Sequence, residues 1–472
     1  MANYKEIKRT LKKFMSFIGP GILVSVAFMD PGNYSEAVSS AALYKYKLLF
    51  AIMISNVFAV ILQVLCCKLG TVTGKDLAEN CKQHLPKRLN YVIYFFSQLA
   101  IIATDLAEIV GTAISLKILF KIPLLLGVLL TVLDCLLILL FYRTDGYSMK
   151  RVRFFELFVT SLVMLTVLCF ILELFKISIP NKKELYEGFL PQPSMFKDHQ
   201  FIYFQIGIMG ATIMPHSLFL GSSVVKSRLQ AYDLKHNGKV TAKPTLSAIK
   251  STLTFSYVEL IISLFFIATF VNSAILIVSG ATLYGQPNAE DADLLSIYDM
   301  LSEYLSPAAG LIFALSILFS GQSATFIGTM TSEIVSMGFL DWTLAPWLTK
   351  LVTRLIAVVP CVFVTIAFGE KGISSILNLS QVVLSLILPI VAGPLIYFTS
   401  CNKYMAVEQD SQEEEEDTQA PDERTLLNSG KKMVYYTNGK FMKWSSIFIW
   451  FTISILNFYL VVSFMLGADV HF

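Results

Sequence analysis

A short polar stretch, Asp-Pro-Gly-Asn at residues 30–33, interrupts an apolar run of membrane length that extends over residues 14–38. Pro31 lacks a backbone N–H group and glycine is a poor helix former, so a helix that enters this stretch must break there. Non-helical backbone at membrane depth is tolerated only where it is buried in protein or lines a cavity. An aspartate at that depth costs about 2.5 to 3.5 kcal/mol, which a bound cation would offset. The stretch therefore predicts an ion site inside a membrane protein.

The composition supports this class, because 55% of the 472 residues are hydrophobic and only 15% are charged. Such a chain is typical of a polytopic membrane protein. We predict an all-α fold with eleven transmembrane helices. The predicted spans are residues 15–42, 48–69, 90–117, 123–142, 154–175, 201–226, 249–278, 308–335, 350–368, 373–398 and 444–466.

The connections between these spans differ in charge. Connections rich in Lys and Arg precede the first span and follow the second, fourth and sixth, whereas residues 279–307 carry acids but no Lys or Arg. Because basic loops stay in the cytosol, this alternation predicts a cytosolic N-terminus. The expected segments are a cytosolic tail (1–14), a first repeat of five spans (15–175), a non-cytosolic loop (176–200), a second repeat of five spans (201–398), a cytosolic linker (399–443) and the last helix with the C-terminus (444–472).

The linker is acidic, with a Glu-rich run at residues 413–417 and little that could pack, so we predict that it is disordered. Within it, the sequence DERTLL at residues 422–427 resembles the acidic dileucine signal that adaptor complexes read for delivery to endosomes or vacuoles. Asp422, Leu426 and Leu427 are therefore candidate sorting residues.

The sixth predicted span contains a second proline-interrupted polar stretch, Met214-Pro215-His216. A shift of 184 residues superimposes Pro215 on Pro31 and Met214 on Asp30. Because each half has five spans, the second half must insert upside down, which predicts an inverted repeat with helices 1 and 6 unwound at the midplane. The alternative is a pair of prolines that merely kink packed helices.

The residues at the two breaks suggest a metal site. Asp30 offers a hard anionic oxygen, Asn33 an amide oxygen and Met214 a soft thioether. A thioether favours Mn, Fe, Co or Cd over Ca and Mg. The alternative for Met214 is ordinary core packing.

Proton coupling requires titratable groups inside the bilayer, and the third span carries Asp105 and Glu108 on one helical face. Arg354 in the ninth span offers the opposite charge, and His216 lies two residues from Met214. We predict a chain of groups that takes a proton from the Asp30 site. The alternative is a static buried salt bridge.

Four motifs in order, at residues 30–33 (DPGN), 103–108 (ATDLAE), 214–216 (MPH) and 321–340, resemble the Nramp family of proton-coupled divalent metal transporters, and most closely its fungal branch with the vacuolar iron-exporting members. The resemblance implies a leucine-transporter-like fold and cotransport of Mn²⁺ or Fe²⁺ with protons. It also implies two further ligands, the carbonyl of Ala211 and the side chain of Gln381.

Two positions depart from the family pattern. Thr353 precedes Arg354 where bacterial relatives carry paired arginines, and Gly221 stands where many relatives have a second histidine.

We therefore predict a secondary active transporter that moves Fe²⁺ or Mn²⁺ with protons into the cytosol, in a vacuolar or endosomal membrane. Its predicted partners are these ions, the lipid bilayer and an adaptor complex, with no nucleic acid and no cofactor. No P-loop or hydrolase motif occurs, which argues against an enzyme. The alternatives are a metal sensor that signals through residues 401–443, or a transporter of the same fold for Mg²⁺ or amino acids.

Overall fold

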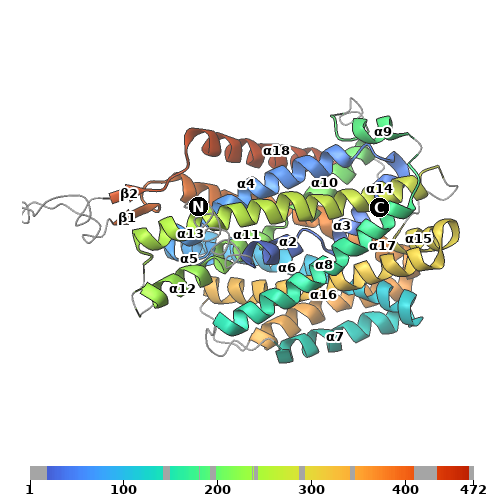
Figure 1. Cartoon of the computed structure of the whole chain (residues 1–472), viewed down its shortest axis with the longest axis horizontal. Coiled ribbons are helices and arrows are strands. Elements are labelled where there is room, and N and C mark those ends of the chain that lie inside the picture. Colours follow the sequence, from blue (N-terminus) through green and yellow to red (C-terminus); the bar gives the residue numbers. More distant parts are fainter. Residues whose placement is uncertain are drawn as a thin grey trace, which may run out of the picture.

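The computed structural model of the chain describes residues 19–141, 149–179, 181–191, 198–236, 238, 243–285, 293–340, 346–408 and 433–466. Its helices lie side by side along a common long axis (Figure 1). The first half contains α2 (Pro20–Val26), α3 (Pro31–Tyr44), α4 (Leu49–Thr73), α5 (Leu77–His84), α6 (Lys87–Phe120), α7 (Leu124–Phe141), α8 (Met149–Lys176) and α9 (Lys182–Glu187).

The second half begins with another pair of short helices. It contains α10 (His199–Thr212), α11 (Pro215–Val224), α12 (Lys226–His236), α13 (Leu246–Ile262), the π-helical turn η2 (Ser263–Ala268), α14 (Thr269–Thr282), α15 (Leu294–Met300), the π-helical turn η4 (Leu301–Leu305), α16 (Pro307–Leu340) and α17 (Pro346–Ser400). The strands β1 (Ala406–Glu408) and β2 (Met433–Tyr435) and the helix α18 (Lys440–Met465) follow.

Both predicted helix breaks are present. Between α2 and α3 the chain leaves the helical conformation, and Asp30 caps the new helix by accepting the N–H of Asn33 on Oδ1 at 2.9 Å. Pro31 and Pro215 each occupy the first position of the helix that follows the break, where a missing N–H group costs nothing. Neither proline can donate to the carbonyl four residues earlier, so the preceding helix ends there.

The two broken helices run in opposite directions. In Figure 1, α2 and α11 lie toward the end of the bundle that carries α5, α12, β1 and β2, whereas α3 and α10 lie toward the end with α9 and α15. The chain therefore passes from the α5 end to the α9 end through the first break and returns through the second. This confirms the leucine-transporter-like fold with two inverted broken helices.

The ends of the bundle also agree with the predicted sidedness of the loops. α5 and α12, which follow the second and sixth predicted spans, lie at one end, whereas α9 and α15, which follow the fifth and seventh, lie at the other. Which end faces the cytosol stays a prediction.

Among the described residues, nine helices are long and apolar enough to cross a membrane. The remaining two predicted spans are the broken pair α2 and α3, whose halves are each too short, and the apolar helix α7, of which only Leu124–Leu133 is described in full. The count of eleven therefore stays a prediction. The ninth and tenth predicted spans are two helices, both within the range labelled α17, that meet at a sharp kink at Gly369, where φ is 66°. A positive φ is readily adopted by glycine, which explains the bend.

The first turn of α2 is anchored by side chains from distant parts of the chain. Glu259 of α13 accepts the N–H groups of Gly19 at 2.8 Å and Gly21 at 2.9 Å. Beside it, Arg228 of α12 donates Nη2 to both oxygens of Glu156 of α8, at 2.9 and 2.8 Å. Both carboxylates are 3% exposed. The free N–H groups of a helix start and one arginine thus compensate two buried acids.

The ends of the predicted linker are ordered in a way that the sequence did not predict. β1 and β2 form an antiparallel ribbon in which Val407 pairs with Val434. Asp422, Leu426 and Leu427 lie outside the described residues, so the proposed sorting signal has no structural description.

Candidate metal site

The first element of the site is the start of α3. Asp30 is completely buried, and its Oδ1 accepts both the backbone N–H and the side-chain Nδ2 of Asn33, at 2.9 and 2.8 Å. Its other oxygen, Oδ2, has no hydrogen-bond partner within the described part of the chain. A buried carboxylate oxygen without a donor is costly, which marks this atom as a candidate ligand for a cation.

Asn33 connects the two breaks. Its Nδ2 donates to the carbonyl oxygen of Ala211 at 2.8 Å, and this carbonyl lies in the last turn of α10. The helical donor for that carbonyl would be residue 215, which is a proline, so the oxygen is available to another partner. The structure thus brings Asp30, Asn33 and Ala211 together, as the sequence and the family resemblance predicted.

The amino group of Asn33 occupies the place that a cation would take. It carries a partial positive charge and is shared between the carboxylate of Asp30 and the carbonyl of Ala211. A divalent ion between these two oxygens would satisfy both. Rotation of the amide by 180° would turn its oxygen toward the same ion, so one side chain can fill the site or help to bind its cargo.

Gln381 of α17 packs against both broken helices. A Cβ atom on Gly32 would lie 2.2 Å from its Nε2, and one on Gly210 would lie 2.1 Å from its backbone oxygen. Both glycines are therefore required for this close approach. The Oε1 of Gln381 is buried and has no hydrogen-bond partner in the described ranges, so it is a second oxygen that lacks a donor next to the first break.

Met214 is fully buried and lies directly before α11, at the second break. Its backbone oxygen accepts the hydroxyl of Ser217 at 2.7 Å, and that hydroxyl accepts Nε2 of Gln63 at 2.8 Å. These bonds fix the backbone from which the thioether projects. The position agrees with the predicted pairing of Met214 with Asp30 in the two repeats.

Neighbouring helices satisfy the carbonyls that the first break exposes. Asn272 of α14 donates to the carbonyl of Phe28 at 2.9 Å, and the hydroxyl of Ser320 of α16 donates to the carbonyl of Met29. A fixed set of side chains thus holds the broken backbone in place, as buried non-helical segments require.

A buried charge cluster lies on α6 and α17. Lys350 forms an ion pair with Asp105, and Nη1 of Arg354 lies 3.0 Å from Oε2 of Glu108 and 3.8 Å from Oδ1 of Asp105. All four side chains are at most 1% exposed. Two acids and two bases leave no net charge, which is what allows the cluster to be buried.

Lys350 was missed by the sequence analysis, which paired the two acids with Arg354 alone. It lies one helical turn before Arg354, so both side chains project from one face of α17 toward α6. The sequence signal that could have identified Lys350 was its spacing of four residues from Arg354. Lys350 thus supplies the second positive charge of the cluster, whereas position 353 carries an uncharged threonine.

His216 links the second helix break with the charge cluster on α6 and α17. Its Nδ1 lies 3.3 Å from the hydroxyl of Thr104, the residue before Asp105, and its ring interacts electrostatically with both Asp105 and Lys350. Asp30 in turn interacts electrostatically with Glu108. All five predicted proton-pathway residues, Asp30, Asp105, Glu108, His216 and Arg354, therefore lie in one connected buried region.

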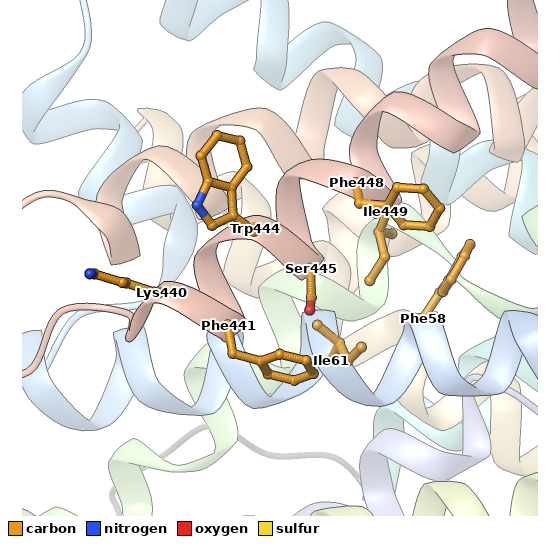
Figure 2. A pocket seen from close by; sticks show the side chains of 8 residues that line it. All are labelled: Phe58, Ile61, Lys440, Phe441, Trp444, Ser445, Phe448 and Ile449. Carbon is orange, nitrogen blue, oxygen red and sulfur yellow. The ribbon is translucent and has the colours of Figure 1, made fainter.

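A groove of about 550 Å³ lies elsewhere, on the outer surface of the bundle between α4 and α18 (Figure 2). Phe441, Trp444 and Phe448, three of its aromatic residues, are 83%, 67% and 64% exposed. Such a surface suits contact with lipid chains. The groove is open to the surroundings, whereas Asp30, Met214 and Gln381 are closed off on all sides, so the groove is not the ion site.

Comparisons with known proteins agree with this geometry. The sequence profile of a family described as "Nramp: Natural resistance-associated macrophage protein-like" matches residues 21–412. The chain is 63% identical over 480 residues to the protein named "Iron transporter SMF3" of Saccharomyces cerevisiae, covering 100% of both chains.

Solved structures show the same architecture. A crystal structure of the Eremococcus coleocola manganese transporter superimposes with a TM-score of 0.78 at 29% identity, covering 98% of this chain and 90% of the other. The structure of MhsT in complex with L-phenylalanine gives a TM-score of 0.56 at 14% identity, covering 94% and 98%. At that identity the second likeness concerns the fold alone.

Proposed function

The chain belongs to the Nramp family, and on that premise we propose that it is a secondary transporter of divalent transition metal ions, with Fe²⁺ and Mn²⁺ as its cargo, rather than an enzyme. Its relative over the full length is named an iron transporter, and a solved relative is a manganese transporter. These names favour transport over a sensor that signals through residues 401–443. They also favour transition metals over Mg²⁺ or amino acids.

One observation supports this function most directly. Asp30 Oδ2 and Gln381 Oε1 are buried without hydrogen-bond donors in the described part of the chain, and the side chain of Gln381 lies against Gly32 at the first break. Next to them, the amino group of Asn33 is held between two acceptor oxygens. We assign the metal to this position, with Asp30, Asn33, Ala211, Met214 and Gln381 as the ligands.

The cluster on α6 and α17 supports proton coupling. Asp105 Oδ2 and Glu108 Oε1 each have no hydrogen-bond partner among the described residues, although the opposite oxygens are paired. A carboxylate with one oxygen unengaged can accept a proton there and keep the hydrogen bond on its other oxygen, although the pair then loses its negative charge. Protons would pass from Asp30 through His216 to this cluster while metal moves from the non-cytosolic side into the cytosol.

The dileucine at Leu426 and Leu427 supports delivery to an endosomal or vacuolar membrane with the N-terminus in the cytosol. If an adaptor complex reads this signal, replacing both leucines with alanine should move a fluorescently tagged protein to another membrane and leave metal uptake intact. An unchanged location would show that the pattern is a coincidence.

The metal site is tested first by Asp30→Ala. In liposomes with an inward acid gradient, we expect the wild-type protein to take up Mn²⁺ and Fe²⁺, and Asp30→Ala to take up neither, because the site loses its formal anion. Gel filtration of the variant controls for folding. Uptake by a well-folded Asp30→Ala protein at the wild-type rate would contradict the assignment.

The proton route is tested by Glu108→Gln and by the double variant Asp105→Asn/Lys350→Met. The double variant removes one acid and one base together, so that no unpaired charge stays buried. Both proteins should lose most of the pH dependence of Mn²⁺ uptake and of metal-stimulated proton flux, with less change in metal affinity. Equal losses in proton flux and in metal binding would instead favour a purely structural ion-pair cluster.

Met214→Ala tests selectivity. A thioether contributes little to a hard ion but bonds to polarizable ions, so its removal should cost Cd²⁺ and Fe²⁺ about 1 kcal/mol, roughly fivefold in affinity. Ca²⁺ should lose almost nothing, and water in the vacated space should make Ca²⁺ competition detectable. Competition of each ion with Mn²⁺ uptake measures the ranking. If Cd²⁺ competes as strongly as before and Ca²⁺ stays excluded, the sulfur is not a ligand.

A further inference from the structure

Glu36 of α3 is a buried acid that the metal site and the proton route do not use. Its side chain is 0% exposed, and neither carboxylate oxygen has a hydrogen-bond partner within the described ranges. Three other buried acids differ in this respect. Glu259 accepts backbone N–H groups, Glu156 is paired with Arg228, and Glu108 is paired with Arg354.

Its position follows from the packing of α3 against α10. The carboxylate lies directly over Gly207, where a Cβ atom would be only 2.4 Å from Oε1. One turn nearer the breaks, Asn33 donates to Ala211 across the same pair of helices. Glu36 is three residues after Asn33 and Gly207 is four residues before Ala211, so the two contacts are successive levels of one interface, about 5 Å apart along the helices.

Glu36 therefore lies between the metal site and the α9 end of the bundle. The helix α3 continues in that direction, and its last residue, Tyr44, donates its hydroxyl to Asp198 directly before α10 at 2.5 Å. An ion that approaches Asp30 from the α9 end along the α3 and α10 interface must pass the level of Glu36.

The helices that pack most extensively on α3 do not provide a charge for Glu36. The sequences of α3 and α10, and of α14, contain no Lys or Arg. An ionised carboxylate at membrane depth costs several kcal/mol unless it is compensated. A proton or a mobile cation can supply that compensation, and the lack of a side chain on Gly207 provides the room that the carboxylate needs.

We propose that Glu36 is a second cation position in the transport path, where a divalent metal ion binds transiently between the α9 end and the site at Asp30. The proposal rests on the proposed function, because it assigns this residue a step in metal transport. The ion would bind there with water as its other ligands while α3 and α10 are apart, and then move one helical turn to Asp30. Two weak positions in sequence allow an ion to enter and to leave more easily than one deep position.

Initial rates of Mn²⁺ uptake by the full chain in liposomes test this proposal. Glu36→Gln should raise the KM for Mn²⁺ roughly fivefold or more, with the maximal rate within about twofold of the wild type, because capture is weakened while the Asp30 site is intact. Glu36→Asp should recover part of the effect. Gly207→Ala should also raise the KM, because its Cβ atom would displace the flexible carboxylate of Glu36. This variant keeps the test valid if Glu36→Gln folds poorly.

Glu173→Gln is the matched control. Glu173 is 1% exposed and both of its oxygens lack hydrogen-bond partners in the described part of the chain, but it lies on α8, which packs mainly on α16 and α14. Its KM should match that of the wild type.

Three outcomes would overturn the second cation position: a wild-type KM for Glu36→Gln and Gly207→Ala, an equal rise for Glu173→Gln, or a change confined to the pH dependence of uptake. The last result would make Glu36 a proton site. A wild-type protein that takes up no metal would instead refute the proposed function itself.

Discussion

The structure depends on two carbonyl groups that cannot find a donor in their own helices. Pro31 and Pro215 remove the N–H groups that would pair with the carbonyls of Ala27 and Ala211, at a depth where water cannot replace them. The helices therefore end, and side chains from elsewhere take over the hydrogen bonds. Asn33 donates a hydrogen bond to the carbonyl of Ala211, while Asn272 and Ser320 donate to carbonyls beside the first break. The proposed ion site is the place where this replacement leaves oxygens in excess.

The buried acids follow a related rule. Several on the scaffold have permanent partners, either an arginine, a lysine or the free N–H groups at the start of a helix. Asp30 and Glu36, at the interface between the broken helices, each have at least one oxygen without a donor in the described ranges, and Glu173 of α8 shares this property away from the breaks. An unpartnered acid at membrane depth is therefore a candidate functional group that an experiment must test position by position.

Much of this could be predicted from the sequence, because local chemistry controls it. Proline, glycine and aspartate in an apolar run specify a broken helix, and their repetition at a fixed spacing specifies the inverted repeat. Lys350 was missed because its pairing with Asp105 depends on how α17 packs on α6. The strand ribbon in the linker likewise depends on contacts between segments that are distant in the sequence. Gln381 was assigned by family resemblance, and only the structure shows that Gly32 and Gly210 admit it.

The polarity of the two breaks affects how long an ion stays bound. At each break one helix ends and another begins, so partial charges of about half an elementary charge of both signs meet there. At the proposed site, the carbonyl ends of α2 and α10 would attract the ion and the amide starts of α3 and α11 would repel it, and the start of α3 already engages one oxygen of Asp30. These opposing partial charges favour a shallow energy well. We expect a short residence time, which suits a carrier because the rate of each cycle is limited by release as well as by capture.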